Sequence, residues 1–187
     1  MKTLKPIAWL IISHAFSGCV THAYLNIYGE DLRECSRDGM ALTGYTRSGK
    51  CVDQIDDAGS HHICIDLSSV NTNTKSKGGQ NFCQVTGQSN WCDESMACVN
   101  SPYEKCPIQN WCVCQWAFAS YIEKAGGCDQ IQDIVCDAIN LEAYLSYKSI
   151  LDENIHRRLS MSQTEKIASA LSCIESRCDH GRIVQSR

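Results

Sequence analysis

The chain has 187 residues, and 14 of them are cysteine. This density is typical of disulfide-built secreted domains and rare in cytosolic enzymes. Lysine and arginine number 17 against 21 acidic residues, so the net charge is −4. Such a balance argues against a nucleic-acid binder, which needs a basic face for phosphates. After residue 23 the sequence contains no apolar span of ~20 residues, so we expect no transmembrane segment.

The first residues predict a secretory signal peptide over residues 1–23. Lys2 and Lys5 precede an apolar run over residues 7–16, and Thr21-His22-Ala23 is a usable cleavage signal. The run is too short to span a membrane. Removing the segment takes out two lysines and leaves 15 basic against 21 acidic residues, a net charge of −6.

The same segment offers a second cleavage site. Phe16-Ser17-Gly18-Cys19 resembles a bacterial lipobox, which would make residues 1–18 a lipoprotein signal and Cys19 a lipid anchor. Both alternatives carry the chain out of the reducing cytosol. We therefore expect a secreted or periplasmic, cell-envelope location, with most cysteines in disulfides.

The first half of the body divides into three kinds of segment. Residues 24–70 alternate turn residues with short β-compatible runs, and residues 71–81 have the polar composition of a surface loop. Residues 82–110 contain four cysteines and almost no aliphatic side chain. This last stretch cannot bury a core of its own, so we expect crosslinks to hold it.

Helical spacing dominates after Trp111. Residues 111–125 place apolar side chains on one helical face and end at a pair of glycines, which predicts a helix and its C-terminal stop. A short strand-like run follows over 131–139, and apolar residues then recur every three or four positions over 141–159. Ser162-Gln163-Thr164-Glu165 has the spelling of a capping box and predicts the start of a last, packing helix.

Four short motifs follow one another along the chain. They are Leu25-Asn26-Ile27-Tyr28-Gly29, Thr43-Gly44-Tyr45-Thr46-Arg47, Gly59-Ser60-His61-His62-Ile63-Cys64 and Trp111-Cys112-Val113-Cys114. In this order they resemble an uncharacterised family, domain of unknown function 2237, over roughly residues 24–147. The resemblance implies a small mixed α/β domain found mostly in bacteria, and it implies no known reaction.

The chain departs from the family pattern at three places. The cysteine-rich stretch 82–110 stands where the family has a loop rich in proline and glycine. The family's Arg-Trp after the cysteine pair is Ala117-Phe118 here, and its later Thr-His falls at Ile139-Asn140, without a histidine. We therefore predict an α+β fold: a disulfide-rich α/β domain over 24–147 with an insertion over 82–110, and a helical C-terminal extension over 148–187.

The resemblance also divides the cysteines. Five occupy family-like positions (Cys35, Cys51, Cys64, Cys112, Cys114) and eight are additions (Cys83, Cys92, Cys98, Cys106, Cys128, Cys136, Cys173, Cys178). An even number of additions suits disulfides that were gained in pairs. We predict local pairing: two bridges within 83–106, one between Cys128 and Cys136, and one between Cys173 and Cys178. The last pair requires the helix to end between its cysteines, because helical side chains five residues apart point away from each other.

Cleavage after Ala23 leaves an odd number of cysteines, 13, so one must be free, bonded to another chain as a covalent dimer, or bound to a metal. A free thiol could simply be a small buried hydrophobe. Zinc held by His61, Cys64, Cys112 and Cys114 is the second interpretation, since these residue types suit a tetrahedral site. Thiol-disulfide exchange by Cys112 or Cys114 is the third, because a helix over 111–125 would place both in its first turn, where a thiolate is stabilised.

The histidine beside the acidic turn also has two interpretations. His61 next to Asp56 and Asp57 could act as a general base, or it could be a turn histidine that bonds to the backbone. Asp53 together with these two carboxylates suggests calcium, although their spacing is not that of an EF-hand and suits a solvated acidic turn.

These observations predict a secreted or envelope-located, disulfide-stabilised module that binds an unknown protein or small-molecule ligand or has a structural role, with no cofactor expected. The alternative is an enzyme, either a thiol-disulfide exchanger or a zinc-dependent one, with Cys112, Cys114 and His61 as candidate catalytic residues.

Overall fold

The computed structural model describes residues 22–69, 81–152 and 160–184. Its centre is a three-stranded antiparallel sheet in the order β4-β1-β5, in which β1 (Ile63–Asp66) pairs with both neighbours. The edge strands are β4 (Asn110–Val113) and β5 (Asp133–Ile134). The fold is thus α+β, as the sequence predicts.

The two faces of this sheet are covered differently. Ile63 lies opposite Val113 in the β1–β4 ladder, and Cys64 lies opposite Cys112. Because side chains alternate along a strand, the isoleucines face one side and the cysteines the other. The first side belongs to the main hydrophobic core, and the second packs against Cys35, Cys51 and Ala138. Both faces of the short sheet are therefore buried.

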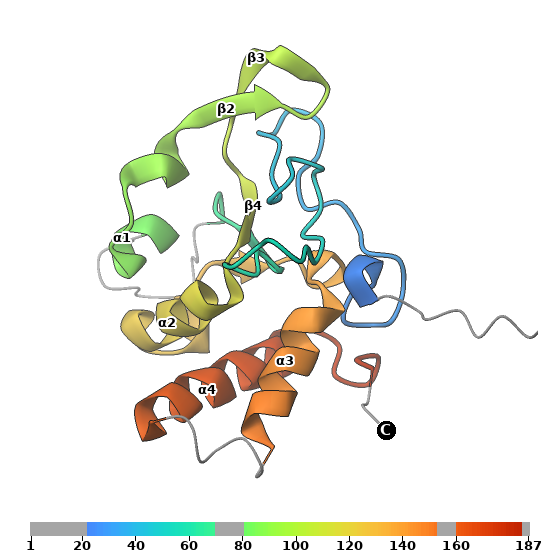
Figure 1. Cartoon of the computed structure of the whole chain (residues 1–187). Helices are drawn as coiled ribbons and strands as arrows, with labels where there is room; N and C mark the ends of the chain where they lie inside the picture. Colours follow the sequence, from blue (N-terminus) through green and yellow to red (C-terminus); the bar gives the residue numbers. More distant parts are fainter. Residues whose placement is uncertain (1–21, 70–80, 153–159, 185–187) are drawn as a thin grey trace, which may run out of the picture.

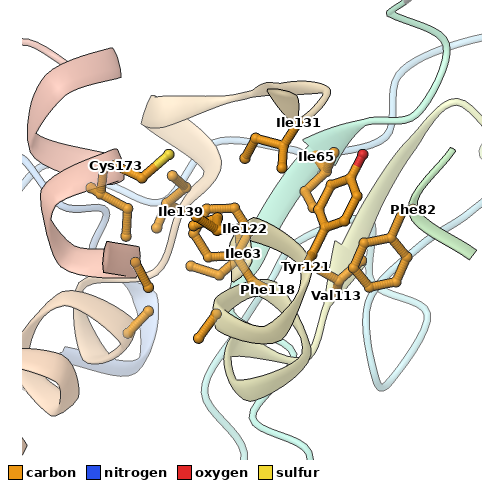
Figure 2. Packing of buried hydrophobic residues seen from close by; sticks show 14 of the residues in the cluster. Ile63, Ile65, Phe82, Val113, Phe118, Tyr121, Ile122, Ile131, Ile139 and Cys173 are labelled. Atoms are coloured by element: carbon orange, nitrogen blue, oxygen red, sulfur yellow. The ribbon is translucent and has the colours of Figure 1, made fainter. Parts of the chain in front are cut away.

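Helices cover the isoleucine face (Figure 1). They are α1 (Phe82–Thr86), α2 (Gln115–Ala125), α3 (Leu141–Leu151) and α4 (Met161–Arg177). Helix α4 packs against both α2 and α3. Figure 2 shows Phe118 and Ile122 of α2 beside Ile63, and Tyr121 beside Phe82, whose rings meet edge to face at 5.1 Å. The described single-turn 3-10 helices are η1 (His22–Tyr24), η3 (Asn90–Asp93), η4 (Cys128–Gln130) and η5 (Cys136–Ala138).

A β-hairpin extends from the other end of the molecule (Figure 1). It consists of β2 (Ser95–Cys98) and β3 (Ser101–Pro107). Disulfides Cys83–Cys92 and Cys98–Cys106 lie within this region, which confirms the two local bridges predicted between residues 83 and 106. They crosslink a stretch with few aliphatic residues to bury.

The other predicted local pairs are wrong. The structure bonds Cys128 to Cys173 and Cys136 to Cys178. Helix α4 runs unbroken to Arg177, so Cys173 and Cys178 point in different directions around its axis and cannot reach each other. Each instead meets a cysteine of the segment that α4 crosses, with Cα–Cα distances of 5.4 and 5.7 Å.

Three local predictions also differ from the structure. The run expected to be helical from Trp111 begins as strand β4, and α2 starts only at Gln115. The capping box of α4 uses Ser160 and Gln163 rather than Ser162 and Glu165. Residues 24–28 form the end of η1, two isolated bridges and a turn instead of a strand. Only the two helices α2 and α4 keep their predicted period with a moved boundary, and tertiary pairing decides the state of the two short apolar runs.

Residues 1–21 of the predicted leader, which include Cys19, and residues 71–80 of the predicted loop lie outside the described residues. Among the helices that the structure does describe, none is long and apolar enough to cross a membrane.

Buried tyrosines predict a loss of stability at alkaline pH. Burial raises the pKa of Tyr121, raises that of Tyr144 to about 12 with help from Glu175, and raises that of Tyr147 well above 10.0. Above pH 10 the unfolded chain releases protons that the folded chain keeps, so stability falls as pH rises from 10 towards 12. We expect a lower melting temperature at pH 11 than at pH 9.

The measurement needs a Cys114→Ser background, so that no free thiol exchanges with the disulfides in base. Tyr144→Phe should flatten the dependence on pH. A melting temperature that is equal at both values would contradict the prediction.

Candidate functional site

A cavity of about 340 Å³ opens between the hairpin region, the start of α2 and two loops of the N-terminal half. We name it the Cys114 pocket. Its lining is mostly aromatic and apolar, with a few polar groups from separate segments (Arg47, His61, Phe82, Gln88, Trp91, Met96, Trp111, Cys112, Val113, Cys114 and Ala117). Its size falls within the ~300–1,000 Å³ of typical small-molecule sites.

Cys114 lies where strand β4 passes into helix α2. It is the N-cap residue of α2, and its side chain makes no capping hydrogen bond. Of the thirteen cysteines that the structure describes, it is the one without a disulfide, and it is half-buried. The position at a helix N-terminus favours negative charge. If the predicted covalent dimer exists, Cys114 is the described residue that would form it.

The other family-like cysteines are paired. Cys35 is bonded to Cys64 and Cys51 to Cys112, and the sulfurs of Cys35, Cys51 and Cys112 lie within 4.8 Å of one another. All four are buried behind the sheet. Of the four residues considered as zinc ligands, only His61 and Cys114 therefore keep a free ligand atom. Of the two considered for thiol exchange, only Cys114 keeps a thiol.

His61 is held by a buried carboxylate. Its Nδ1 lies 2.7 Å from Asp57 Oδ1, and its backbone N–H donates to Asp57 Oδ2 at 2.7 Å. Burial by itself would raise the pKa of Asp57, but the hydrogen bonds from His61 and Gly59 outweigh it and leave the pKa below 3.8. The ionised carboxylate can only accept, so His61 Nδ1 carries the proton, which leaves Nε2 as the acceptor of the neutral ring. This ring bonds to a carboxylate, whereas we expected a bond to the backbone.

The acidic turn is less solvated than its composition predicts. Asp57 is 5% exposed, and Asp53 lies 3.0 Å from Nε2 of buried His62. These two carboxylates thus face two different histidines. Within the described residues, these aspartates do not form a cluster of three or more metal-ligating side chains.

Several contacts fix the His61 loop against the start of α2. The backbone N–H of Gln115 donates to the Ser60 carbonyl at 3.0 Å, and His62 Nδ1 lies 2.9 Å from Gln115 Oε1. A Cβ on Gly59 would lie 2.6 Å from the His61 ring, so any other residue at this position would displace the ring. The loop therefore holds His61 beside the residue that follows Cys114.

Arg47 supplies the pocket's permanent positive charge. Its guanidinium carbon lies 4.9 Å from the centre of the Trp111 ring, and no carboxylate among the described residues forms an ion pair with it. Trp91 also packs against Trp111, with ring centres 5.7 Å apart and the ring planes tilted by 41°. The arrangement presents a cation beside two flat aromatic surfaces.

Two residues near the pocket have backbone conformations that side chains rarely adopt. They are Arg47, with φ of 54°, and Ser60, with φ of 49°, and among the described residues no other non-glycine has positive φ. Such conformations cluster at functional sites because the surrounding structure must hold them.

Sequence reasoning found Cys114 and His61 but missed Arg47 and Trp91. The signal that could have indicated Arg47 is its place at the end of the Thr-Gly-Tyr-Thr-Arg motif, and its partner Trp111 likewise opens the Trp-Cys-Val-Cys motif. Nothing in the spacing of Arg47 and Trp111 shows that these two side chains would stack.

The fold and the site define a small disulfide-rich α+β domain with an aromatic pocket and a free thiol at its edge. The chain belongs to the family of uncharacterised proteins conserved in bacteria called DUF2237, whose model matches residues 25–144. This confirms the resemblance carried by the motifs. The match includes every residue of the Cys114 pocket and stops before α4. No curated protein matches the chain.

Proposed function

We propose that the protein is an exported binding module whose Cys114 pocket takes a small anionic ligand with an aromatic or apolar body. The observation that carries this proposal is Arg47 stacked on Trp111 at the wall of a cavity. The family has no known reaction to supply a substrate, so the ligand is defined here by its chemistry.

The aromatic wall favours a flat or apolar ligand body. Trp91 stacks obliquely on Trp111, and Phe82 lies 6.1 Å from Trp91, centre to centre. Ligand sites are lined in this way, with a few polar groups that fix orientation. Burying a ring against such a wall removes apolar surface from water, which supplies most of the affinity.

Arg47 favours an anionic group on that body. A guanidinium binds carboxylate or phosphate through two parallel hydrogen bonds, and the Trp111 ring supports its plane. No described carboxylate forms an ion pair with Arg47, and no acidic residue lines the Cys114 pocket. The positive charge of Arg47 would repel a cationic ligand.

The disulfides support export. Twelve described cysteines form six disulfides, which is consistent with an extracellular or periplasmic location, since such bonds are rare in a reducing cytosol. The leader over residues 1–23, or the lipoprotein alternative ending at Cys19, would direct this export.

The proposal predicts selective binding of aromatic anions. We expect benzoate to shift the NMR signals of the Trp91 and Trp111 indoles, and size-matched benzylamine to leave them unchanged. Arg47→Gln should weaken benzoate binding by about tenfold, the loss expected for one hydrogen bond to a charged group. Arg47→Lys should keep part of the affinity, because it keeps the charge but loses the planar fork.

Arg33→Gln is the matched control, because Arg33 is an exposed arginine outside the Cys114 pocket. It should bind benzoate like the unmodified protein. Equal responses to benzoate and benzylamine, or no response from either indole, would contradict the proposal and favour a purely structural role.

A further inference from the structure

We propose that Cys114 is a covalent attachment site, which forms a mixed disulfide with small, carboxylate-bearing disulfides that enter the pocket. The inference rests on the proposed anion-binding function and names the class of ligand that the site would retain. It depends on three functional groups from three separate segments that line one cavity, Cys114, His61 and Arg47.

The thiol is placed for reaction with a ligand. Cys114 lines the cavity, is half-buried, and is the N-cap residue of an eleven-residue helix. The N-terminus of a helix favours negative charge. Within the part of the chain that the structure describes, no hydrogen bond engages its sulfur. Tyr147 lies near enough for the Cys114 charge to add to burial in raising the pKa of Tyr147.

His61 is the base that lines the same cavity as the thiol, and we assign it the thiol proton. Asp57 holds its Nδ1–H, so the free Nε2 is the basic nitrogen, as in other sites where a carboxylate orients a histidine beside a nucleophile. The Gln115 N–H donates to the Ser60 carbonyl at 3.0 Å, which joins the chain neighbours of Cys114 and His61. A hydrogen bond between a base such as His61 and its nucleophile commonly closes only once a ligand is bound.

The reaction is a thiol-disulfide exchange that balances without any further oxidant. Cys114 transfers its proton to His61 Nε2, and the thiolate attacks one sulfur of the small disulfide. The new sulfur–sulfur bond forms as the old one breaks, and the departing thiolate takes the proton from His61. The protein thiol is oxidised, and one half of the small disulfide is reduced to a free thiol.

The exchange should stop at this mixed disulfide. A dithiol enzyme releases its partner when a second cysteine attacks, but Cys112, two residues away, is buried and bonded to Cys51. The site would therefore retain its ligand covalently instead of turning over disulfides. Arg47 selects a ligand whose anionic group lies a few bonds from the sulfur.

The test compares two disulfides that differ in charge. The protein, with its six disulfides formed and Cys114 as a free thiol, is incubated with 3,3′-dithiodipropionate, a dianion, or with cystamine, a dication of similar length. Intact mass and peptide mapping follow the formation of adducts. We expect one adduct, on Cys114, that forms about tenfold faster with the dianion. Cys114→Ser should form none. Arg47→Gln should lose the charge preference and keep the adduct.

His61→Gln separates the proton-transfer role from a structural one. Among the described residues, Arg47 and His61 line the cavity with the thiol, and Tyr147 interacts with it electrostatically. The variant should react about tenfold more slowly at pH 7 and match the unmodified protein above pH 9, where an ordinary thiol ionises without a base. A deficit that persists at high pH would overturn that role.

Failure of the inference is distinguishable from failure of the proposed function. If neither disulfide forms an adduct while benzoate still binds, the covalent site is overturned and the binding module stands. If both react at equal rates, Arg47 does not select charge, which overturns the anionic class of ligand. Adducts on other cysteines, or a disulfide-linked dimer through Cys114, also overturn the inference.

Discussion

Replacing the buried disulfide behind the sheet, Cys51→Ala with Cys112→Ala, is expected to cost about 4 kcal/mol of unfolding free energy. The bond closes a separation of 61 residues, and the entropy that a crosslink removes from the unfolded chain grows with the closed loop. Both cysteines are at most 2% exposed, so the change also leaves unfilled volume beside Cys35–Cys64. Urea denaturation followed by circular dichroism measures the loss.

The hairpin disulfide is the matched control. Cys98→Ala with Cys106→Ala also removes one bond, but that bond closes a separation of only 8 residues, so about 2.5 kcal/mol is expected. A larger loss for the hairpin pair than for the sheet pair would show that loop entropy does not govern stability here.

Within the same Trp-Cys-Val-Cys motif, Cys114→Ser should behave quite differently. Its sulfur forms no bond, and serine is a favoured N-cap residue. We expect stability within about 1 kcal/mol of the unmodified protein. Two cysteines separated by one residue would then have separate roles, Cys112 in stability and Cys114 in the pocket. A loss from Cys114→Ser as large as that of the double variant would contradict this assignment.

Much of the fold follows from local sequence pattern, because the spacing of apolar residues and the position of glycines reflect side-chain and backbone geometry. The apolar period after residue 141 and the paired glycines after α2 each predict a helix or its end from side-chain geometry. Crosslinks within 83–106 follow from the absence of aliphatic residues there. The motif order identified the family, and six residues of those motifs line the pocket (Arg47, His61, Trp111, Cys112, Val113 and Cys114).

The pairings across the molecule could not be predicted in this way. Disulfides Cys128–Cys173 and Cys136–Cys178 depend on where α4 lies against the 128–138 segment, and a sequence of cysteine positions allows many connectivities. Arg47 on Trp111 likewise joins residues 64 positions apart along the chain. His61 was recognised, but its partner Asp57 looked like one of several exposed carboxylates until burial distinguished it.

One buried amide connects the pocket side of the sheet to the helical layer, and its loss should be nearly as costly as that of a disulfide. Asn140 is fully buried, and its side chain donates to the carbonyls of Ala23 and Cys51 at 2.8 and 3.0 Å. Its Oδ1 accepts from the Glu142 N–H as the N-cap of α3. Asn140→Ala leaves the Cys51 carbonyl and the Glu142 N–H unpaired. It also removes one of two donors to the Ala23 carbonyl, which keeps the Asp53 N–H. We therefore expect a loss of about 3 kcal/mol.

Asn140→Ser divides that loss between its causes. Serine keeps an N-cap acceptor for α3 but is too short to reach the two carbonyls, so it should recover about 1 kcal/mol relative to alanine. The remainder belongs to the amide donors, one of which supports Cys51 and hence the disulfide to Cys112. Urea denaturation of both variants separates these contributions. Equal stabilities for alanine and serine would assign no energy to the cap, and a total loss below about 1 kcal/mol would mean that water replaces the amide at both carbonyls.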